Sequence, residues 1–207
     1  MLRSRPVQVV LGATLVVQSA ALASGAAKRG ETIPAPPVLE AAIVTSAPAT
    51  PVVEVAVASM EKDADAKALA IAEKYRKKGY RVPDTLAKQI HAAASAHDIE
   101  PEIAFGLVAV ESGFRRTARS HVGATGLAQL MPATARWLEP GTTRRQLEDP
   151  ETNLRLGFRY LRDMIDRYDG DTRLALLAYN RGPGTVDRVL RRGGNPDNGY
   201  PRKVMGR

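Results

Sequence analysis

The pattern of apolar and polar positions predicts helices and no strands. From Pro83 onward, apolar residues recur every three or four positions, which is the spacing of one buried helical face. Six helices are expected: Asp84 onward, Pro101 to Ser112, Pro132 to Leu138, Pro150 through Tyr168, Thr172 to about Asn180, and Gly184 to Arg192. No stretch alternates convincingly with the period of a half-buried strand. The sequence therefore predicts an all-α fold, with one domain at residues 83–207.

Residue types at the ends of these helices support the prediction. Asp84 and Asp149 stand where an N-cap side chain accepts a hydrogen bond from the first turn. Pro101 and Pro150 suit the first helical position, because the N–H that proline lacks would have no helical partner there. Gly113 follows the second helix and is expected to end it.

The N-terminal part is expected to contain an export signal, a linker and one helix. Residues 1–23 combine two arginines, a short apolar run and an Ala-x-Ala cleavage sequence, as signal peptides do. An uncleaved membrane anchor is the alternative, although the run is short for a spanning helix. Residues 24–59 are rich in Ala, Val and Pro and predict a disordered tether. Residues 60–79 predict a helix that either packs on the domain or stands alone. The signal sequence at residues 1–23 indicates an exported, periplasmic protein.

Composition and charge narrow the chemistry without choosing a function. The formal net charge of +8 suits an anionic partner, such as nucleic acid, anionic lipid or a cell-wall polymer. The arginines are scattered and lack an accompanying pattern of aromatic residues, so no nucleic-acid binding is expected. The chain has no cysteine, which excludes disulfides, thiolate metal sites and a cysteine nucleophile. Its three histidines share no helical face, so no metal site is expected.

Glu111 is the candidate for acid–base chemistry. With Ala104 and Leu107 it follows the i, i+3, i+7 spacing of one helical face, so it continues an apolar stripe. Burial and the negative end of the helix dipole both raise the pKa of a carboxyl group. A glutamic acid so placed keeps its proton near neutral pH, as a general acid must. The alternatives are a solvated carboxylate or an ion pair with a nearby arginine.

Two later segments strengthen this hypothesis. Residues 120–135 read S-x-x-G-A-x-G-L-x-Q-L-M-P-x-T-A, with glycines that let the backbone approach a ligand and a glutamine that both donates and accepts hydrogen bonds. Residues 178–184 read A-Y-N-R-G-P-G and place a tyrosine and an asparagine at a helix end. Each segment alone is also explained by an ordinary loop or helix cap. Together with E-S-G-F at residues 111–114, they resemble the lytic transglycosylases of the soluble, SLT-domain type, which have a lysozyme-like fold.

This resemblance, which covers Asp84 to about Val204, implies a reaction and a set of site residues. Members of the family have an active-site groove, need no cofactor or metal, and cleave the β-1,4 bond between N-acetylmuramic acid and N-acetylglucosamine in peptidoglycan, leaving a 1,6-anhydro-muramyl end. By the match of motifs, Glu111 is the catalytic acid and base. The implied substrate-binding residues are Ser120, Gly126, Gln129, Met131, Tyr179, Asn180 and Tyr200.

Three positions depart from the family's pattern. Ala128 stands where methionine is usual, which is expected to remove an apolar wall from the sugar site. Arg181 replaces a small residue and adds charge after the Ala-Tyr-Asn sequence. Pro201 follows Tyr200, the tyrosine that resembles the family's last motif.

The expected partner is the glycan strand of peptidoglycan, and the protein is expected to be a monomer. A component of an envelope or secretion machine is a possible further partner. Two other functions stay open on the sequence alone. One is a hydrolytic muramidase on the same fold, with water as the nucleophile. The other is a non-catalytic peptidoglycan-binding component of an envelope machine.

Overall fold

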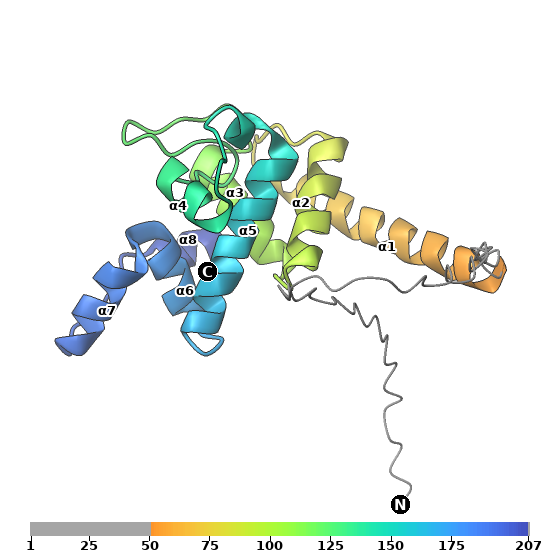
Figure 1. Ribbon diagram of the computed structural model, residues 1–207. Helices are drawn as coiled ribbons and strands as arrows, with labels where there is room; N and C mark the ends of the chain where they lie inside the picture. Colours follow the sequence, from red (N-terminus) through yellow and green to blue (C-terminus); the bar gives the residue numbers. More distant parts are fainter. Residues whose placement is uncertain (1–50, 207) are drawn as a thin grey trace, which may run out of the picture. The chain divides into compact units, whose positions relative to one another are not determined.

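The computed structural model describes the backbone of residues 51–206 and the side chains of residues 59–206. Within this part of the chain the fold is helical, without strands, so the predicted all-α class is confirmed (Figure 1). Isolated antiparallel bridges join Arg119 to Thr125 and Thr125 to Leu130. The helices are α1 (Pro51–Arg76), α2 (Asp84–Ala96), α3 (Pro101–Ser112), α4 (Pro132–Leu138), the 3₁₀-helix η1 (Gln146–Glu148), α5 (Pro150–Arg167), α6 (Thr172–Arg181), α7 (Pro183–Arg191) and α8 (Tyr200–Met205).

Most predicted helix ends are confirmed. The bounds of α3 and α4 agree with the prediction, and Gly113 ends α3 in the left-handed conformation. Asp149 caps α5, where its carboxylate accepts a hydrogen bond from the Thr152 N–H at 2.9 Å. The N-cap prediction for Asp84 is wrong, because Asp84 is the first residue of α2 and its carboxylate instead pairs with Arg76 at 2.5 Å.

The helix α1 is longer at its N-terminus than predicted. It begins at Pro51, so the predicted tether at residues 24–59 does not extend to its expected end. Proline suits the first turn of a helix, and the sequence contains no proline between residues 52 and 82 to interrupt it. The helix ends at Arg76 rather than at residue 79, since the chain already turns toward Gly79. The expected signal peptide and residues 24–50 of the tether lie outside the described residues.

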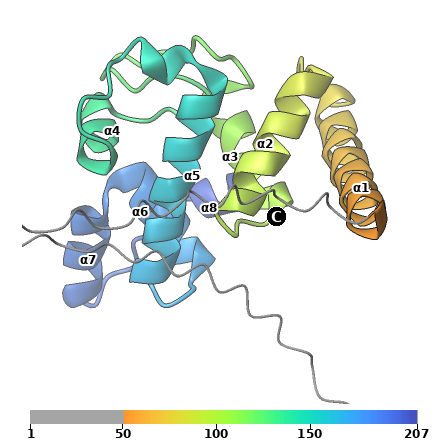
Figure 2. The ribbon, with the colours of Figure 1, turned by 45° about the vertical axis from the view of Figure 1, so that its right-hand side comes forward.

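The sequence left open whether α1 packs on the domain or stands alone, and the structure shows that it packs on the domain. The helix packs on α2 and α3, as Figure 2 shows for α2, and it buries Ala68 and Ala72 completely. An ion pair of 2.6 Å joins Asp65 of α1 to Lys88 of α2. Among residues 51–206, no helix has the length and apolar character needed to cross a bilayer.

The core lies around α5, which packs between α2 and α6 (Figure 1). Its side chains Leu154, Phe158 and Leu161 are fully buried. The helix α3 is buried nearly all round, because every residue from Ala104 to Ala109 is inaccessible or almost so. A helix enclosed in this way has a fixed position, and so has the residue at its C-terminal end.

Gly106 allows α8 to lie directly against α3. A Cβ atom at Gly106 would lie 1.9 Å from the backbone oxygen of Val204, far inside van der Waals contact. Tyr200 precedes Val204 by four residues and therefore lies on the same face of α8. The close approach at Gly106 thus sets the distance between Tyr200 and α3.

Candidate active site

Glu111 is partly buried at the C-terminal end of α3. Ala104 and Leu107 on the same face are fully buried, so the predicted continuation of the apolar stripe is confirmed. The Tyr200 hydroxyl of α8 donates a hydrogen bond to Glu111 Oε1. Arg115 instead donates its Nε–H to the Ser112 carbonyl at 2.9 Å, and no ion pair within residues 59–206 involves Glu111.

Burial is the main cause of the altered acidity at this site. It raises the pKa of Glu111 above its ordinary value, and the hydrogen bond from Tyr200 offsets part of that rise by favouring the carboxylate. Burial and the negative charge of Glu111 raise the pKa values of both Tyr179 and Tyr200 well above normal. The two tyrosines therefore stay protonated and serve as hydrogen-bond donors, while Glu111 retains its proton to higher pH than an exposed glutamic acid does.

Tyr179 approaches this site from α6. Its hydroxyl donates to the Ala128 carbonyl at 2.7 Å, and its ring lies 5.4 Å from the ring of Tyr160. Gly157 makes room for this arrangement, because a Cβ there would lie 3.4 Å from the Tyr179 hydroxyl oxygen and 2.5 Å from Ala128 Cβ. The neighbouring Asn180 is exposed, and its Oδ1 accepts a hydrogen bond from Asn198 at 2.9 Å.

The polar side chains predicted as sugar contacts in segment 120–135 make hydrogen bonds to the backbone of that segment and to Ala118 just before it. Ser120 Oγ accepts a hydrogen bond from the backbone N–H of Ala124 at 3.0 Å. Gln129 has a φ of 46° and donates its side-chain amide to the Ala118 and Gly126 carbonyls at 3.0 and 2.9 Å. Met131 is 39% exposed and is therefore accessible to a ligand.

Asn153 is a residue of this region that the sequence reasoning missed. It is 1% exposed and lies in α5, where its side-chain amide donates to the Thr125 and Leu147 carbonyls, both at 2.9 Å. Its oxygen accepts from the Ala128 N–H at 2.7 Å. An asparagine directly before Leu154, on the buried face of an amphipathic helix, was the signal available in the sequence.

Ala128, which stands where the resemblance leads one to expect methionine, belongs to the core. Its side chain is fully buried and packs closely on Gly157, so in this chain it fills a tight contact between the loop and α5. Arg181 likewise has a structural partner, since it donates to the Pro196 carbonyl at 2.6 Å. Within residues 59–206, no three His, Asp or Glu side chains are grouped as metal ligands would be.

The fold and this site define the class of protein as an all-helical, lysozyme-like domain with one partly buried glutamate beside two tyrosines. Residues 88–199, more than half of the chain, match the family model described as Transglycosylase SLT domain. The chain belongs to this family.

Similar proteins cover the same part of the chain. The transglycosylase of Enterobacteria phage PRD1 is 40% identical over 116 residues, which are 56% of this chain and 40% of that protein. The soluble lytic murein transglycosylase of Escherichia coli K12 is 36% identical over 98 residues, 44% of this chain and 15% of that protein. A 70-kDa soluble lytic transglycosylase, solved in complex with bulgecin A, aligns with a TM-score of 0.50 and 28% identity over 58% of this chain and 24% of that one. The chain spans less than half the length of each of these relatives.

Proposed function

We propose that this protein is a peptidoglycan lytic transglycosylase. It cleaves the bond between N-acetylmuramic acid and N-acetylglucosamine without water and leaves a 1,6-anhydro-muramyl end. The observation that carries the proposal is the state of Glu111, a partly buried carboxyl of raised pKa whose hydrogen-bond partner is a tyrosine. Membership of the SLT family supports the same reaction.

Glu111 performs both proton transfers in this mechanism. Its carboxyl proton goes to the glycosidic oxygen as the bond from that oxygen to the muramyl C1 breaks. The resulting carboxylate then takes the proton of the muramyl C6 hydroxyl, and the C6 oxygen bonds to C1. The glycan has lost one bond and gained one, and Glu111 is protonated again.

A single carboxylate suffices for this reaction. Ordinary glycosidases pair two carboxylates, about 5–5.5 Å apart when retaining and 6.5–9.5 Å apart when inverting. Within residues 59–206, no other carboxylate is among the groups that shift the pKa of Glu111. An attacking hydroxyl that belongs to the substrate needs no second carboxylate to activate water.

The residues proposed to form the sugar-binding site differ in how accessible they are. Tyr179 and Tyr200 stand beside Glu111, while Asn180 and Met131 are exposed and available to the sugars. Ser120, Gly126 and Gln129 hold the shape of the segment that carries Met131. We further propose that the protein is exported and acts as a monomer on glycan strands in the periplasm, with the secretory pattern of residues 1–23 as support.

The product of the reaction tests the proposal. Digestion of purified peptidoglycan, followed by mass spectrometry, should yield muramyl ends that lack one water relative to a reducing end. Reducing ends would identify a hydrolytic muramidase instead. Intact glycan that still retains the protein would identify a non-catalytic binding component.

Replacing Tyr200 with phenylalanine should move the pH dependence of cleavage. The Tyr200 hydroxyl lowers the pKa of Glu111, so its removal raises that pKa further and keeps the general acid protonated to higher pH. The alkaline limb of the pH–rate profile is therefore expected to shift upward, with a lower maximal rate. A profile that keeps its alkaline limb in place would show that the hydroxyl does not tune Glu111.

A further inference from the structure

A cavity with a basic lining lies at the C-terminal end of α3. It has a volume of about 670 Å³, and its apolar floor includes Leu86 and Phe114, which are 8% and 5% exposed. Three exposed arginines line it, namely Arg81, Arg115 and Arg116. None of its lining residues carries a carboxylate. We call this feature the arginine cavity.

The charges of the arginine cavity are not neutralised within the described part of the chain. Arg81 and Arg116 have no hydrogen bond or ion pair there. Arg115 uses only its Nε–H, on the Ser112 carbonyl, which holds the guanidinium in place and leaves its terminal nitrogens for a ligand. Of the acids close in sequence to the lining residues, Asp84 pairs with Arg76, Asp149 caps α5, and Glu151 is exposed and does not line the cavity.

A rigid corner of the backbone positions two of these arginines. Gly113 and Phe114 have φ values of 59° and 63°, and the second is a conformation that phenylalanine rarely adopts. The Phe114 ring is held by the rings of Tyr75 and Tyr80, at 5.2 and 5.5 Å. Packing of this kind maintains a strained residue in place. Gly113 is two residues beyond Glu111, so their Cα atoms are at most roughly 7 Å apart.

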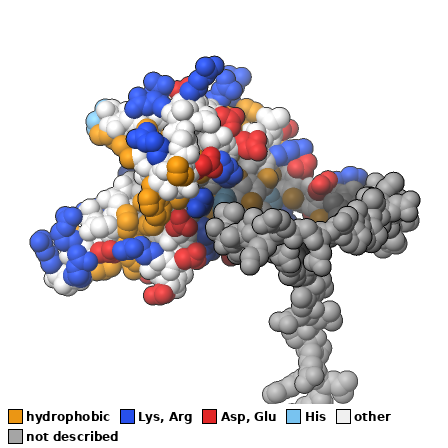
Figure 3. Space-filling view, in the orientation of Figure 1, with side chains coloured by type: hydrophobic (Ala, Val, Ile, Leu, Met, Phe, Trp, Pro, Cys, Tyr) orange, Lys and Arg blue, Asp and Glu red, His pale blue; other side chains and the backbone are white. Residues whose placement is uncertain are grey.

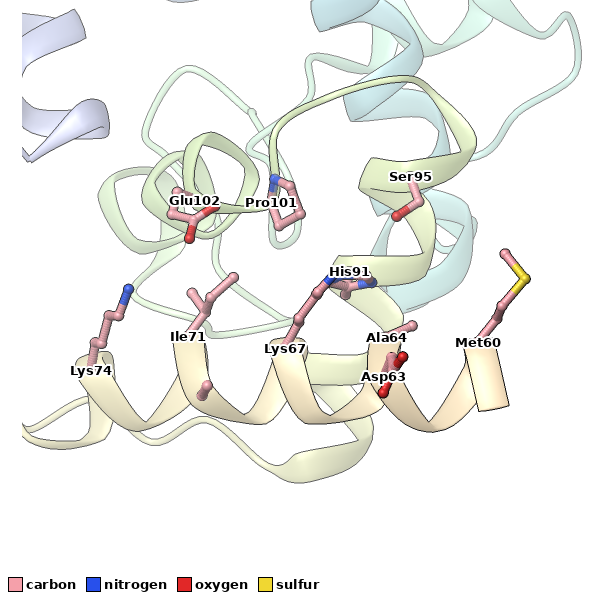
Figure 4. Close-up of a pocket in the computed structure, with 11 residues that line it drawn as sticks. Met60, Asp63, Ala64, Lys67, Ile71, Lys74, His91, Ser95, Pro101 and Glu102 are labelled. Carbon is pink, nitrogen blue, oxygen red and sulfur yellow. The ribbon is translucent and has the colours of Figure 1, made fainter. Parts of the chain in front are cut away.

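The overall basic charge does not by itself produce such a cavity. A second cavity, of about 690 Å³, lies between α1, α2 and α3 (Figure 4). It has Lys67 and Lys74 on α1, but Asp63 and Glu102 line it too. Basic and acidic side chains are also mixed over the face of the domain in Figure 3. Unbalanced positive charge in a cavity that Gly113 lines, two residues along the chain from Glu111, therefore favours an anionic ligand.

We propose that the arginine cavity binds carboxylates of the peptide stem carried by the muramyl residue next to the cleaved bond. The inference rests on the proposed function and defines its substrate as the peptide-bearing glycan strand. Stem peptides extend from the muramyl sugar and carry free carboxylates, which guanidinium groups bind through paired hydrogen bonds. Gly113 lines the cavity and is two residues from Glu111, which is why the stem of the sugar held at Glu111 is the proposed occupant.

The test compares peptide-bearing glycan strands with strands stripped of their peptides by an amidase. The full-length protein should cleave the peptide-bearing strands with the lower KM. The double variant Arg81→Ala/Arg116→Ala should lose this preference, with a rise in KM of roughly fivefold on peptide-bearing strands, because each exposed ion pair contributes only modestly. The matched control, Lys67→Ala/Lys74→Ala, removes the same charge from the second cavity and should keep the preference.

Binding measured without turnover separates this inference from the proposed function. Full-length Glu111→Gln protein should sediment with peptide-bearing strands more strongly than with stripped strands, and the arginine double variant in that background should not. Two results would overturn the inference and indicate a general attraction to anionic wall polymer. One is equal binding of peptide-bearing and stripped strands, and the other is a lysine control that loses the preference for peptide-bearing strands as much as the arginine variant does. A wild-type protein that yields no anhydro ends would overturn only the proposed function, because the binding preference is measured by sedimentation and does not depend on cleavage.

Discussion

Glu111→Gln is expected to abolish glycan cleavage and leave the fold intact. The amide keeps the shape of the side chain, and its oxygen can still accept the hydrogen bond from Tyr200. It has no acidic proton for the leaving oxygen and cannot take the proton of the C6 hydroxyl. Loss of general acid–base catalysis lowers rates by about 10²–10⁴-fold, and one residue performs both steps here. The measurement is the release of anhydro-muramyl products from purified peptidoglycan.

The stability of this variant provides an internal check. Because folding raises the pKa of Glu111, the carboxyl group lowers the stability of the fold progressively as the pH rises above its pKa in the unfolded chain, and a neutral amide avoids this cost. The variant should therefore unfold at the same temperature as wild type or higher at neutral pH. Glu102→Gln, at the exposed first turn of the same helix, is the control and should keep its activity. Turnover retained by Glu111→Gln would refute the role of Glu111.

Local sequence signals predicted the scaffold of the site well. The period of apolar residues and the glycine at position 113 placed Glu111 on the buried face at the end of α3. These features depend on neighbours within one or two helical turns, so they can be recognised along the chain. The predicted start of α1, at residue 60, was wrong because the proline-rich segment was taken to continue beyond its last proline, Pro51, where the helix in fact begins.

The resemblance named Tyr200 as a site residue, but its hydrogen bond to Glu111 could not be predicted from the sequence. Tyr200 lies 89 residues from Glu111, on a helix of six residues that is too short to show a period. Its position depends on the close contact between Gly106 and Val204, which only the packed structure reveals. The arginine cavity was missed for the same reason, because Arg81 and Arg116 are distant in sequence and counted as scattered charge.

Asn153→Asp is expected to destabilise the protein strongly, by about 3–5 kcal/mol in the free energy of unfolding. The side-chain amide of Asn153 donates to two backbone carbonyls, at Thr125 and Leu147. A carboxylate in that place would present an acceptor oxygen to both carbonyls and bury a charge without a cation. Gly126 packs on the same amide, since a Cβ there would lie 2.2 Å from Asn153 Nδ2, so little room exists for relief.

The pH dependence of the loss identifies its cause. The buried carboxyl of the Asn153→Asp variant would have a raised pKa, because its protonated form restores one of the two donors. Folding then favours proton binding, and the destabilisation should shrink as the pH falls through that raised pKa. Denaturant unfolding at acid and neutral pH measures this, with Asn195→Asp as the control, because Asn195 is exposed and accepts a bond from the Asp197 N–H that a carboxylate keeps. A loss of equal size at both pH values would show that missing donors are not the cause. The expected result would establish Asn153 as the residue that holds the loop containing Thr125 and Ala128 against α5.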